Sequence, residues 1–159
     1  MRKILNPYAT GMRSNCKCFG CSPHNEFGLN MEFYEKDGEV ISYWRPKEHF
    51  EGYDNVLHGG IQGTMLDEIA SWVVNTQCKT GGVTAQMDVR FRKPVFMNGG
   101  ELTIKARLKE HNSRMATIQA EVYNADGDIC SEAEVKYMIF PEKIAREKFG
   151  YPGIEHFFE

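Results

Sequence analysis

The sequence predicts an α+β domain in which one long antiparallel sheet curls around a single buried helix. Only one long segment, residues 61–74, repeats its apolar side chains at helical spacing, and it is apolar around much of its circumference. Six shorter segments are strand-like, two before the helix and four after it, and five of them alternate apolar and polar residues. One helix covers only part of such a sheet, so we expect a second subunit to cover the rest.

The elements follow in a simple order along the chain. Residues 1–28 are rich in Gly, Pro, Asn and Ser and are expected to form an irregular lead-in. Residues 29–34 alternate, residues 40–44 are strand-like, and Asp37-Gly38 between them is a turn signal, so these segments predict a hairpin. The helix that follows is expected to end before Gly81-Gly82.

Four strands after the helix should each bury one face and expose the other. They are expected at residues 83–91, 102–108, 118–122 and 129–139. In the first of them, the alternation assigns Val83, Ala85, Met87, Val89 and Phe91 to the buried face, and Thr84, Gln86, Asp88 and Arg90 to the exposed face. Pro141 then opens a short charged helical tail.

The composition fits one domain. A chain of 159 residues can bury a core, and 42% hydrophobic and 26% charged residues are ordinary for a globular protein. The segments divide it into an irregular N-terminal part at 1–28, the folded domain at 29–140 and a helical tail at 141–159.

The net charge and the hydropathy of the chain limit the kinds of partner that it is expected to bind. The formal net charge is −3, so nothing global argues for nucleic acid. The first residues, Met1 to Pro7, contain no apolar signal region, and no segment approaches the length that spans a membrane. We therefore expect no nucleic-acid or membrane partner and a cytoplasmic location.

Five cysteines leave one unpaired, which disfavours a complete set of internal disulfides. Cys16, Cys18 and Cys21 crowd together, with His24 close behind. Cys and His are the usual zinc ligands, but the spacing is not that of a standard zinc knuckle and no second half-site follows. We expect reduced thiols in a packed segment and no metal.

His58-Gly59-Gly60, followed by Asp67-Glu68, carries the most chemical information. A helix that opens on glycine offers unpaired backbone N–H groups and the positive end of its dipole, which suit a developing oxyanion. A carboxylate in an otherwise apolar helix is costly unless it is used or paired. The pattern predicts a hydrolytic site with an oxyanion hole and a base or nucleophile.

The distance along the helix between Gly59 and Asp67 indicates whether one subunit or two would form the site. Asp67 lies about two turns beyond Gly59, roughly 10–12 Å along the axis at 1.5 Å per residue. A reacting carbonyl must lie about 3 Å from its oxyanion donor and close to the base. The spacing therefore favours a composite site, with Gly59 from one subunit and Asp67 from the other.

The chain resembles the hotdog-fold thioesterases, specifically the phenylacetate-degradation-type branch of the 4-hydroxybenzoyl-CoA thioesterase superfamily. The resemblance runs from Cys18 to about Phe140. Its marks are Cys18-Phe19-Gly20-Cys21 with Gly28-Leu29, His58-Gly59-Gly60 with Asp67-Glu68, Val89-Arg90-Phe91-Arg92-Lys93-Pro94 and Glu132-Ala133-Glu134. The resemblance implies that residues 29–140 form a hotdog domain, a long curved antiparallel sheet wrapped around one central helix.

The resemblance also implies an activity and roles for residues. The activity is hydrolysis of an acyl-CoA thioester, which is a substrate and not a cofactor, in a site shared across a homodimer or a dimer of dimers. Asp67 would be general base or nucleophile, the Gly59 N–H would bind the thioester carbonyl, and Thr84 would help to hold the water. Many relatives carry an amide side chain in the loop before the histidine, a place that Asn55 could fill.

Other candidates surround these residues. His58 is expected to shape the Gly-Gly turn through ring hydrogen bonds more than to act as a base. Gly60 opens the helix with Gly59, and Glu68, about 100° around the helix from Asp67, could face solvent, a cation or the partner. Arg90 and Arg92 follow the helix on a strand where paired donors could meet a phosphate of coenzyme A, although a solvated strand end explains them as well.

Two other function classes remain open. An acyl-thioester dehydratase or hydratase on the same fold would need a second catalytic histidine, which has no obvious place here. A non-catalytic acyl-CoA-binding protein is disfavoured by Asp67. The acyl group, the choice between dimer and tetramer, and any shared role of the clustered cysteines stay open.

Overall fold

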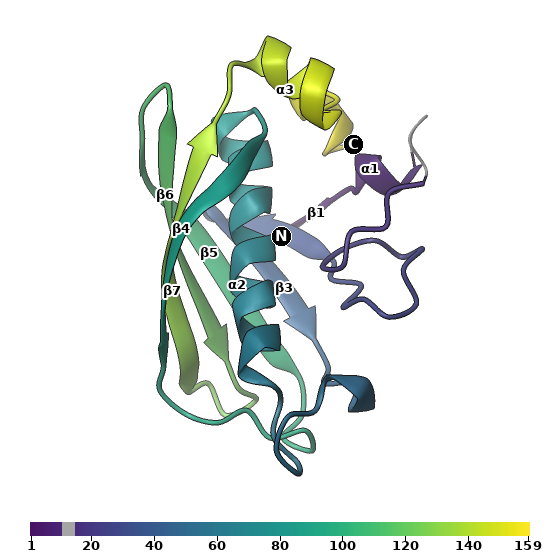
Figure 1. Cartoon of the computed structure of the whole chain (residues 1–159), viewed down its shortest axis with the longest axis vertical. Helices are drawn as coiled ribbons and strands as arrows, with labels where there is room; N and C mark the ends of the chain where they lie inside the picture. Colours follow the sequence, from purple (N-terminus) through teal and green to yellow (C-terminus); the bar gives the residue numbers. More distant parts are fainter. Residues whose placement is uncertain (11–14) are drawn as a thin grey trace.

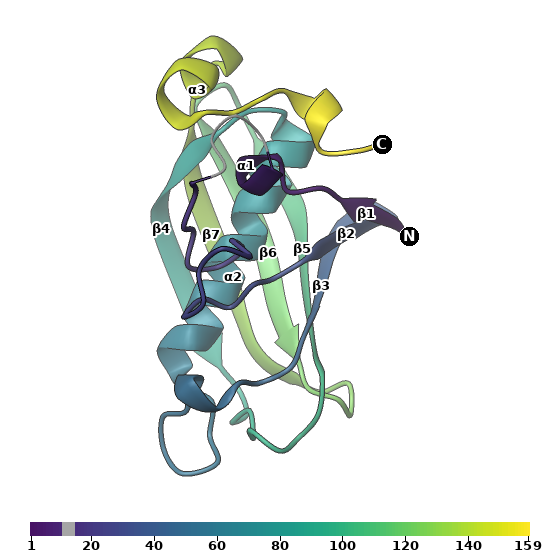
Figure 2. The same ribbon diagram turned by 90° about the vertical axis from the view of Figure 1, so that its right-hand side faces the viewer.

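A computed structural model describes residues 1–10 and 15–159 of the chain. A twisted sheet forms one layer, a long helix, α2, lies against it, and the N-terminal segment covers the other side of that helix (Figures 1 and 2). Residues 11–14 of the expected irregular segment 1–28 lie outside the described residues. No helix in the described ranges combines the length and the apolar character needed to cross a membrane.

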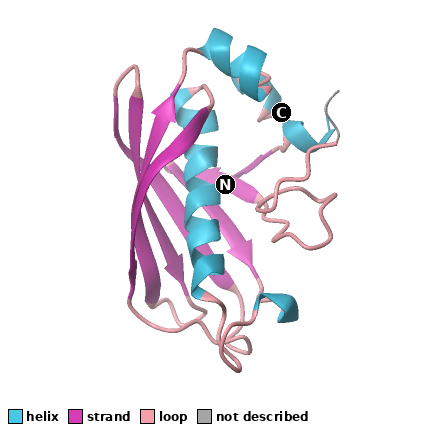
Figure 3. Cartoon of the chain, in the orientation of Figure 1, coloured by secondary structure: helices cyan, strands magenta, loops and turns pink. Residues whose placement is uncertain are grey.

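The sheet has seven strands in the order β1-β2-β3-β5-β6-β7-β4, and every neighbouring pair is antiparallel. Their bounds are β1 Arg2–Ile4, β2 Phe33–Lys36, β3 Glu39–Trp44, β4 Gly82–Phe91, β5 Leu102–His111, β6 Met115–Tyr123 and β7 Ile129–Ile139. The expected order of two strands, one helix and four strands is confirmed. Figure 3 shows the strands in magenta and the helices in cyan. One strand was missed, because β1 lies within the segment expected to be irregular and pairs with β2.

The N-terminal segment is more ordered than its composition predicts. It contains β1 and a short helix, α1 (Pro7–Thr10). The expected strand over residues 29–34 begins only at Phe33, because the N–H groups of Leu29 and Met31 donate to the carbonyls of Phe19 and Gly20 and not to another strand.

The central helix α2 spans Gly59–Val73, and a π-helical turn, Val74–Cys78, extends it. It begins two residues before the expected start because His58 caps it: the ring Nδ1 accepts the Gly60 N–H at 2.9 Å. The helix ends at Lys79, which adopts a left-handed conformation with φ of 56°, before the glycine pair expected to stop it.

The π-helical turn joins both ends of the chain to the helix. The Tyr8 hydroxyl donates to Asn75 Oδ1 at 2.9 Å, and the Tyr151 hydroxyl donates to the Asn75 carbonyl at 3.0 Å. Nearby, Phe157 from the C-terminal tail packs edge-on against Trp72. The tail itself contains α3 (Glu142–Phe149), as expected.

Strand β4 departs from the expected alternation. Thr84 pairs with Tyr137 and Gln86 pairs with Lys136, so Ala85 has no partner residue on β7 and forms a bulge. The bulge reverses the phase of the strand, which places Thr84 on the helix side together with Met87 and Phe91. The assignment of Val83 to the buried face and of Thr84 to the exposed face was therefore wrong; Val83 pairs with the exposed Met138 and is 41% exposed.

The apolar core lies between α2 and the central strands. The helix contributes Met65, Leu66 and Ile69, which are fully buried against the sheet. Strand β4, at the edge of the sheet, is the exception: Met87 and Phe91 face the helix side yet are 38% and 57% exposed. The edge strand thus presents apolar side chains that this chain alone does not cover.

Candidate functional site

The carboxylate of Asp67 is the best-positioned acid of the expected site. Its Oδ1 accepts two hydrogen bonds, from the Thr84 hydroxyl at 2.6 Å and from the Tyr137 hydroxyl at 2.7 Å. No donor among the described residues reaches its other oxygen, Oδ2, and no basic side chain pairs with it there. Asp67 is therefore oriented through one oxygen, while the second is left for a water molecule or a substrate.

The bulge at Ala85 explains why Thr84 can reach Asp67. In a regular strand Thr84 would lie opposite Met138, on the face away from the helix. The extra residue shifts Thr84 opposite Tyr137, so the two hydroxyl donors lie side by side on neighbouring strands. Thr84, expected only to help hold the water, therefore hydrogen-bonds to Asp67 itself, by a local irregularity that the alternation did not indicate.

Tyr137 was missed by the sequence analysis. Its ring is buried, and its hydroxyl lies 2.7 Å from Asp67 Oδ1 and 2.8 Å from the Asp67 carbonyl oxygen. Burial, and then the nearby Asp67 charge, raises the pKa of Tyr137, so the phenol stays neutral and donates its proton. In the sequence it is one more side chain on the buried face of a strand, and only the register of β7 against β4 reveals its role.

The N-terminus of α2 provides a free backbone donor. Gly60 donates to the His58 ring, and Ile61 and Gln62 donate to the His58 carbonyl. The Gly59 N–H donates to no atom of the described residues. It stands at the positive end of the helix dipole, as an oxyanion donor should. The ring and the carbonyl group of His58 thus hold the first turn of α2 together.

An open depression adjoins this donor. It has a volume of about 510 Å³ and is lined by Glu51, Gly52, Tyr53, Val56, Leu57, His58 and Gly59. On the neighbouring side, a Cβ atom added to Gly59 would lie 3.6 Å from the Phe91 ring at the end of β4. Gly59 thus lies between a surface depression and an exposed aromatic ring.

Asn55, a candidate for substrate binding, is engaged within its own loop. It adopts a left-handed backbone with φ of 60°, its Nδ2 donates to Asn98 Oδ1 at 3.1 Å, and its Oδ1 accepts the Asn98 N–H at 3.3 Å. These bonds fix the loop before His58 and use both ends of the amide.

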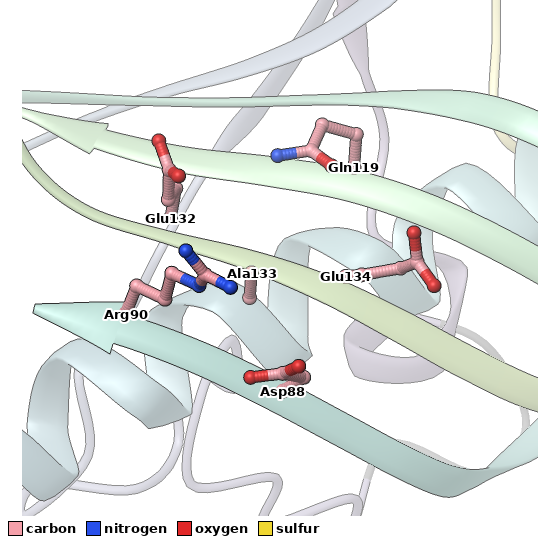
Figure 4. Close-up of a pocket in the computed structure, with 6 residues that line it drawn as sticks. All are labelled: Asp88, Arg90, Gln119, Glu132, Ala133 and Glu134. Carbon is pink, nitrogen blue, oxygen red and sulfur yellow. The ribbon is translucent and has the colours of Figure 1, made fainter.

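Arg90 and Arg92 lie apart from Asp67. Arg90 projects from β4 on the sheet face away from α2, where Asp88, Gln119, Glu132, Ala133 and Glu134 line a polar depression of about 230 Å³ with it (Figure 4). Arg92 forms an ion pair with Glu132 at 2.8 Å. The structure therefore does not bring these two cations together with the Asp67 carboxylate within one chain.

Glu68 points away from its neighbour Asp67. Its carboxylate accepts the Trp72 indole N–H at 3.1 Å and contacts the Cys18 thiol of the N-terminal segment. The sequence left open whether Glu68 faces solvent, a cation or the partner; within this chain its half-buried carboxylate faces the N-terminal segment.

Part of the chain matches a known protein family. Residues 54–131, which contain the capped helix, Asp67 and Thr84, match the family model of the thioesterase superfamily. An uncharacterised protein of Schizosaccharomyces pombe is 40% identical over 67 residues. That match covers 40% of this chain and only 38% of the yeast protein.

Solved structures share the fold. A thioesterase superfamily protein, RHA08564, superposes with a TM-score of 0.67 and 24% identity, over 74% of this chain and 60% of its own. A hypothetical thioesterase of Streptococcus pneumoniae, crystallised with coenzyme A, gives a TM-score of 0.65 and 23% identity, over 71% and 90% of the two chains. The curved antiparallel sheet around one helix is the hotdog fold, and through residues 54–131 the chain belongs to the thioesterase superfamily.

Proposed function

We propose that this protein hydrolyses acyl-CoA thioesters, with Asp67 as the catalytic carboxylate. The observation that carries the proposal is the asymmetry of that carboxylate, whose Oδ1 is held by Thr84 and Tyr137 while Oδ2 has no donor among the described residues. This arrangement holds the carboxylate in one orientation and leaves its second oxygen able to accept a proton from water or to attack a carbonyl carbon. The structural relative crystallised with coenzyme A supports the choice of substrate class.

The chemistry needs few groups. Asp67 takes a proton from a water molecule that attacks the thioester carbonyl, or attacks that carbonyl itself to form a mixed anhydride that water then opens. The Gly59 N–H and the helix dipole stabilise the oxyanion, and the carbon–sulfur bond then breaks. Coenzyme A leaves as a stable thiolate, so no strong general acid is required.

The proposed site is shared between two subunits. Gly59 and Asp67 are eight residues apart on one straight helix, about 12 Å at the usual rise, too far to act on the same carbonyl. Two antiparallel helices related by a two-fold axis would bring Gly59 of one chain to Asp67 of the other. The uncovered apolar side chains of the edge strand β4, Met87 and Phe91, favour such a pairing.

The direct test measures release of free thiol from acetyl-, medium-chain, long-chain, benzoyl- and phenylacetyl-CoA. Asp67→Asn keeps an oxygen that can accept from Thr84 and Tyr137, so the fold should survive while kcat falls at least about a hundredfold. Asp88→Asn, an exposed acid on the outer face of β4, is the matched control and should keep its activity.

The panel also separates the alternatives. A folded wild-type protein that binds coenzyme A but releases no thiol from any member would favour a non-catalytic acyl-CoA-binding protein. Equal activity of Asp67→Asn and wild type would remove Asp67 from the mechanism. The ranking of aromatic against aliphatic substrates would test the phenylacetate-type assignment, which stays a prediction.

A further inference from the structure

Two cysteines and one carboxylate meet on the side of α2 that faces away from the sheet. Cys18 and Cys21 come from the N-terminal segment, and Glu68 comes from the helix. Their sulfur and carboxylate oxygen atoms all lie within 4.8 Å of one another. Segments about fifty residues apart in sequence therefore place three potential metal ligands around one point.

The distances suit a tetrahedral metal. Cys18 Sγ lies 3.5 Å from Glu68 Oε1 and 3.6 Å from Oε2. With zinc–sulfur and zinc–oxygen bonds of about 2.3 and 2.0 Å at the tetrahedral angle, sulfur and oxygen ligands are separated by about 3.5 Å. The observed spacing therefore matches two ligands of one zinc ion.

The loop that carries the cysteines is shaped to present them. The Ser22 N–H donates to the Cys18 carbonyl at 3.1 Å, which curls the Cys-Phe-Gly-Cys segment into a tight turn. The turn keeps the two thiols close together, within 4.8 Å of each other and of the Glu68 carboxylate.

Gly20 is needed for the carboxylate to enter this turn. A Cβ atom at that position would lie 2.5 Å from the Glu68 carboxyl carbon, which is closer than real side chains approach. The glycine thus lets the helix carboxylate lie directly against the cysteine loop. Ordinary packing of a loop on a helix would not call for a charged group at this contact.

The cluster also lacks a basic partner. No lysine or arginine forms an ion pair with Glu68 among the residues that the structure describes, and its hydrogen-bond donors are the Trp72 indole and the Cys18 thiol. Two thiols and a carboxylate that lie together without a basic side chain can be stabilised by a cation bound between them.

We propose that Cys18, Cys21 and Glu68 bind one zinc ion, which fastens the N-terminal segment to the central helix. Thiolate sulfur together with a carboxylate oxygen is a donor set that zinc accepts. Three protein ligands leave the fourth position to water, because Cys16 does not belong to the group of mutually close donors. The sequence alone led to the opposite expectation, because the third ligand lies on a distant helix.

The test uses reduced, metal-free full-length protein titrated with Zn²⁺ and, separately, with Co²⁺. Cobalt bound by thiolates gives a charge-transfer absorption band that a carboxylate or histidine site lacks. The wild-type chain should bind about one metal ion with this band. Cys18→Ser and Cys21→Ser should each lose it, while Glu68→Gln should keep it with at least about tenfold weaker binding.

Cys16→Ser is the matched control, since it removes a cysteine from the same segment but outside the cluster. Its metal binding should equal that of the wild type. Because a cysteine variant could fail to fold, zinc should also protect two thiols of the wild type from alkylation, and mass mapping should identify them as Cys18 and Cys21. A wild-type chain without the cobalt band, or equal loss of metal in Cys16→Ser and Cys18→Ser, would show that this site does not exist.

Discussion

Two adjacent acids on α2 have opposite surroundings. Asp67 faces β4 and β7 and receives hydrogen bonds from two hydroxyl groups, whereas Glu68 faces the N-terminal segment and contacts two thiols. One residue of helix turns a side chain by about 100°, which is enough to carry it from one side of the helix to another. The comparison teaches that a carboxylate's role follows from the donors around it, which neighbouring positions need not share.

The largest effect is expected from the oxyanion donor that would work with Asp67. Gly59→Pro deletes the free N–H at the first helical position, where proline is tolerated and His58 already has an extended backbone. Loss of one such donor should lower kcat about 10²–10³-fold. Gly59→Ala keeps the N–H, and its Cβ would lie at ordinary contact distance from Phe91, so its kcat should stay much nearer to wild type. Equal kcat values for the two variants would exclude this donor.

Mixing the two inactive variants tests whether the Asp67 side of the helix is completed by a second chain. Subunits carrying Gly59→Pro and subunits carrying Asp67→Asn, unfolded together and refolded, should form hybrids with one intact composite site. With random pairing, about a quarter of the wild-type activity should return. If both groups act within one chain, the mixture should be as inactive as its components.

Tyr137→Phe, a change next to Asp67, should lower kcat less than the loss of the oxyanion donor does. It removes one of the two donors that orient Asp67 Oδ1 and leaves the buried ring in place. We expect kcat to fall roughly tenfold and the free energy of unfolding to fall by about 1–3 kcal/mol, measured by urea denaturation. Thr84→Val, at an exposed position where water can replace the hydroxyl, should cost less stability than Tyr137→Phe.

The smallest expected effect is a rise in Tm when zinc binds at the proposed site beside Glu68. Saturation with Zn²⁺ at about a hundredfold excess over its dissociation constant should raise Tm by roughly 5–10 °C over the chelated protein. Cys18→Ser should show the same Tm with and without zinc. A zinc-dependent rise that survives in Cys18→Ser would place the stabilising metal elsewhere in the chain.

The sequence predicts more of the contacts on the Asp67 side of α2 than of those on the Glu68 side. His58, Gly59 and Asp67 could be found because cap, donor and acid lie within ten residues of one helix, and helical spacing is a local rule. Tyr137 could not, because its contact depends on the register of β7. Glu68 and Cys18 are fifty residues apart, so their contact is a property of the folded chain alone.

Local patterns also failed where a single residue or hydrogen bond changed the outcome. The alternation in β4 was broken by one bulged residue, Ala85, which no turn or glycine signal marks. Leu29 and Met31 alternate like a strand, but their N–H groups are bound by the cysteine loop. In both cases a non-local backbone partner overrode the pattern of side chains.

The π-helical turn at the end of α2 couples the stability of the two chain ends. Through Asn75, it accepts one hydroxyl from Tyr8 and another from Tyr151, residues that lie near opposite ends of the sequence. Detachment of either end breaks one of these hydrogen bonds and exposes the turn to water. Amide hydrogens around α1, the last turn of α2 and the C-terminal tail should therefore exchange with solvent in one cooperative opening, so that the termini unfold as a single unit and do not fray separately.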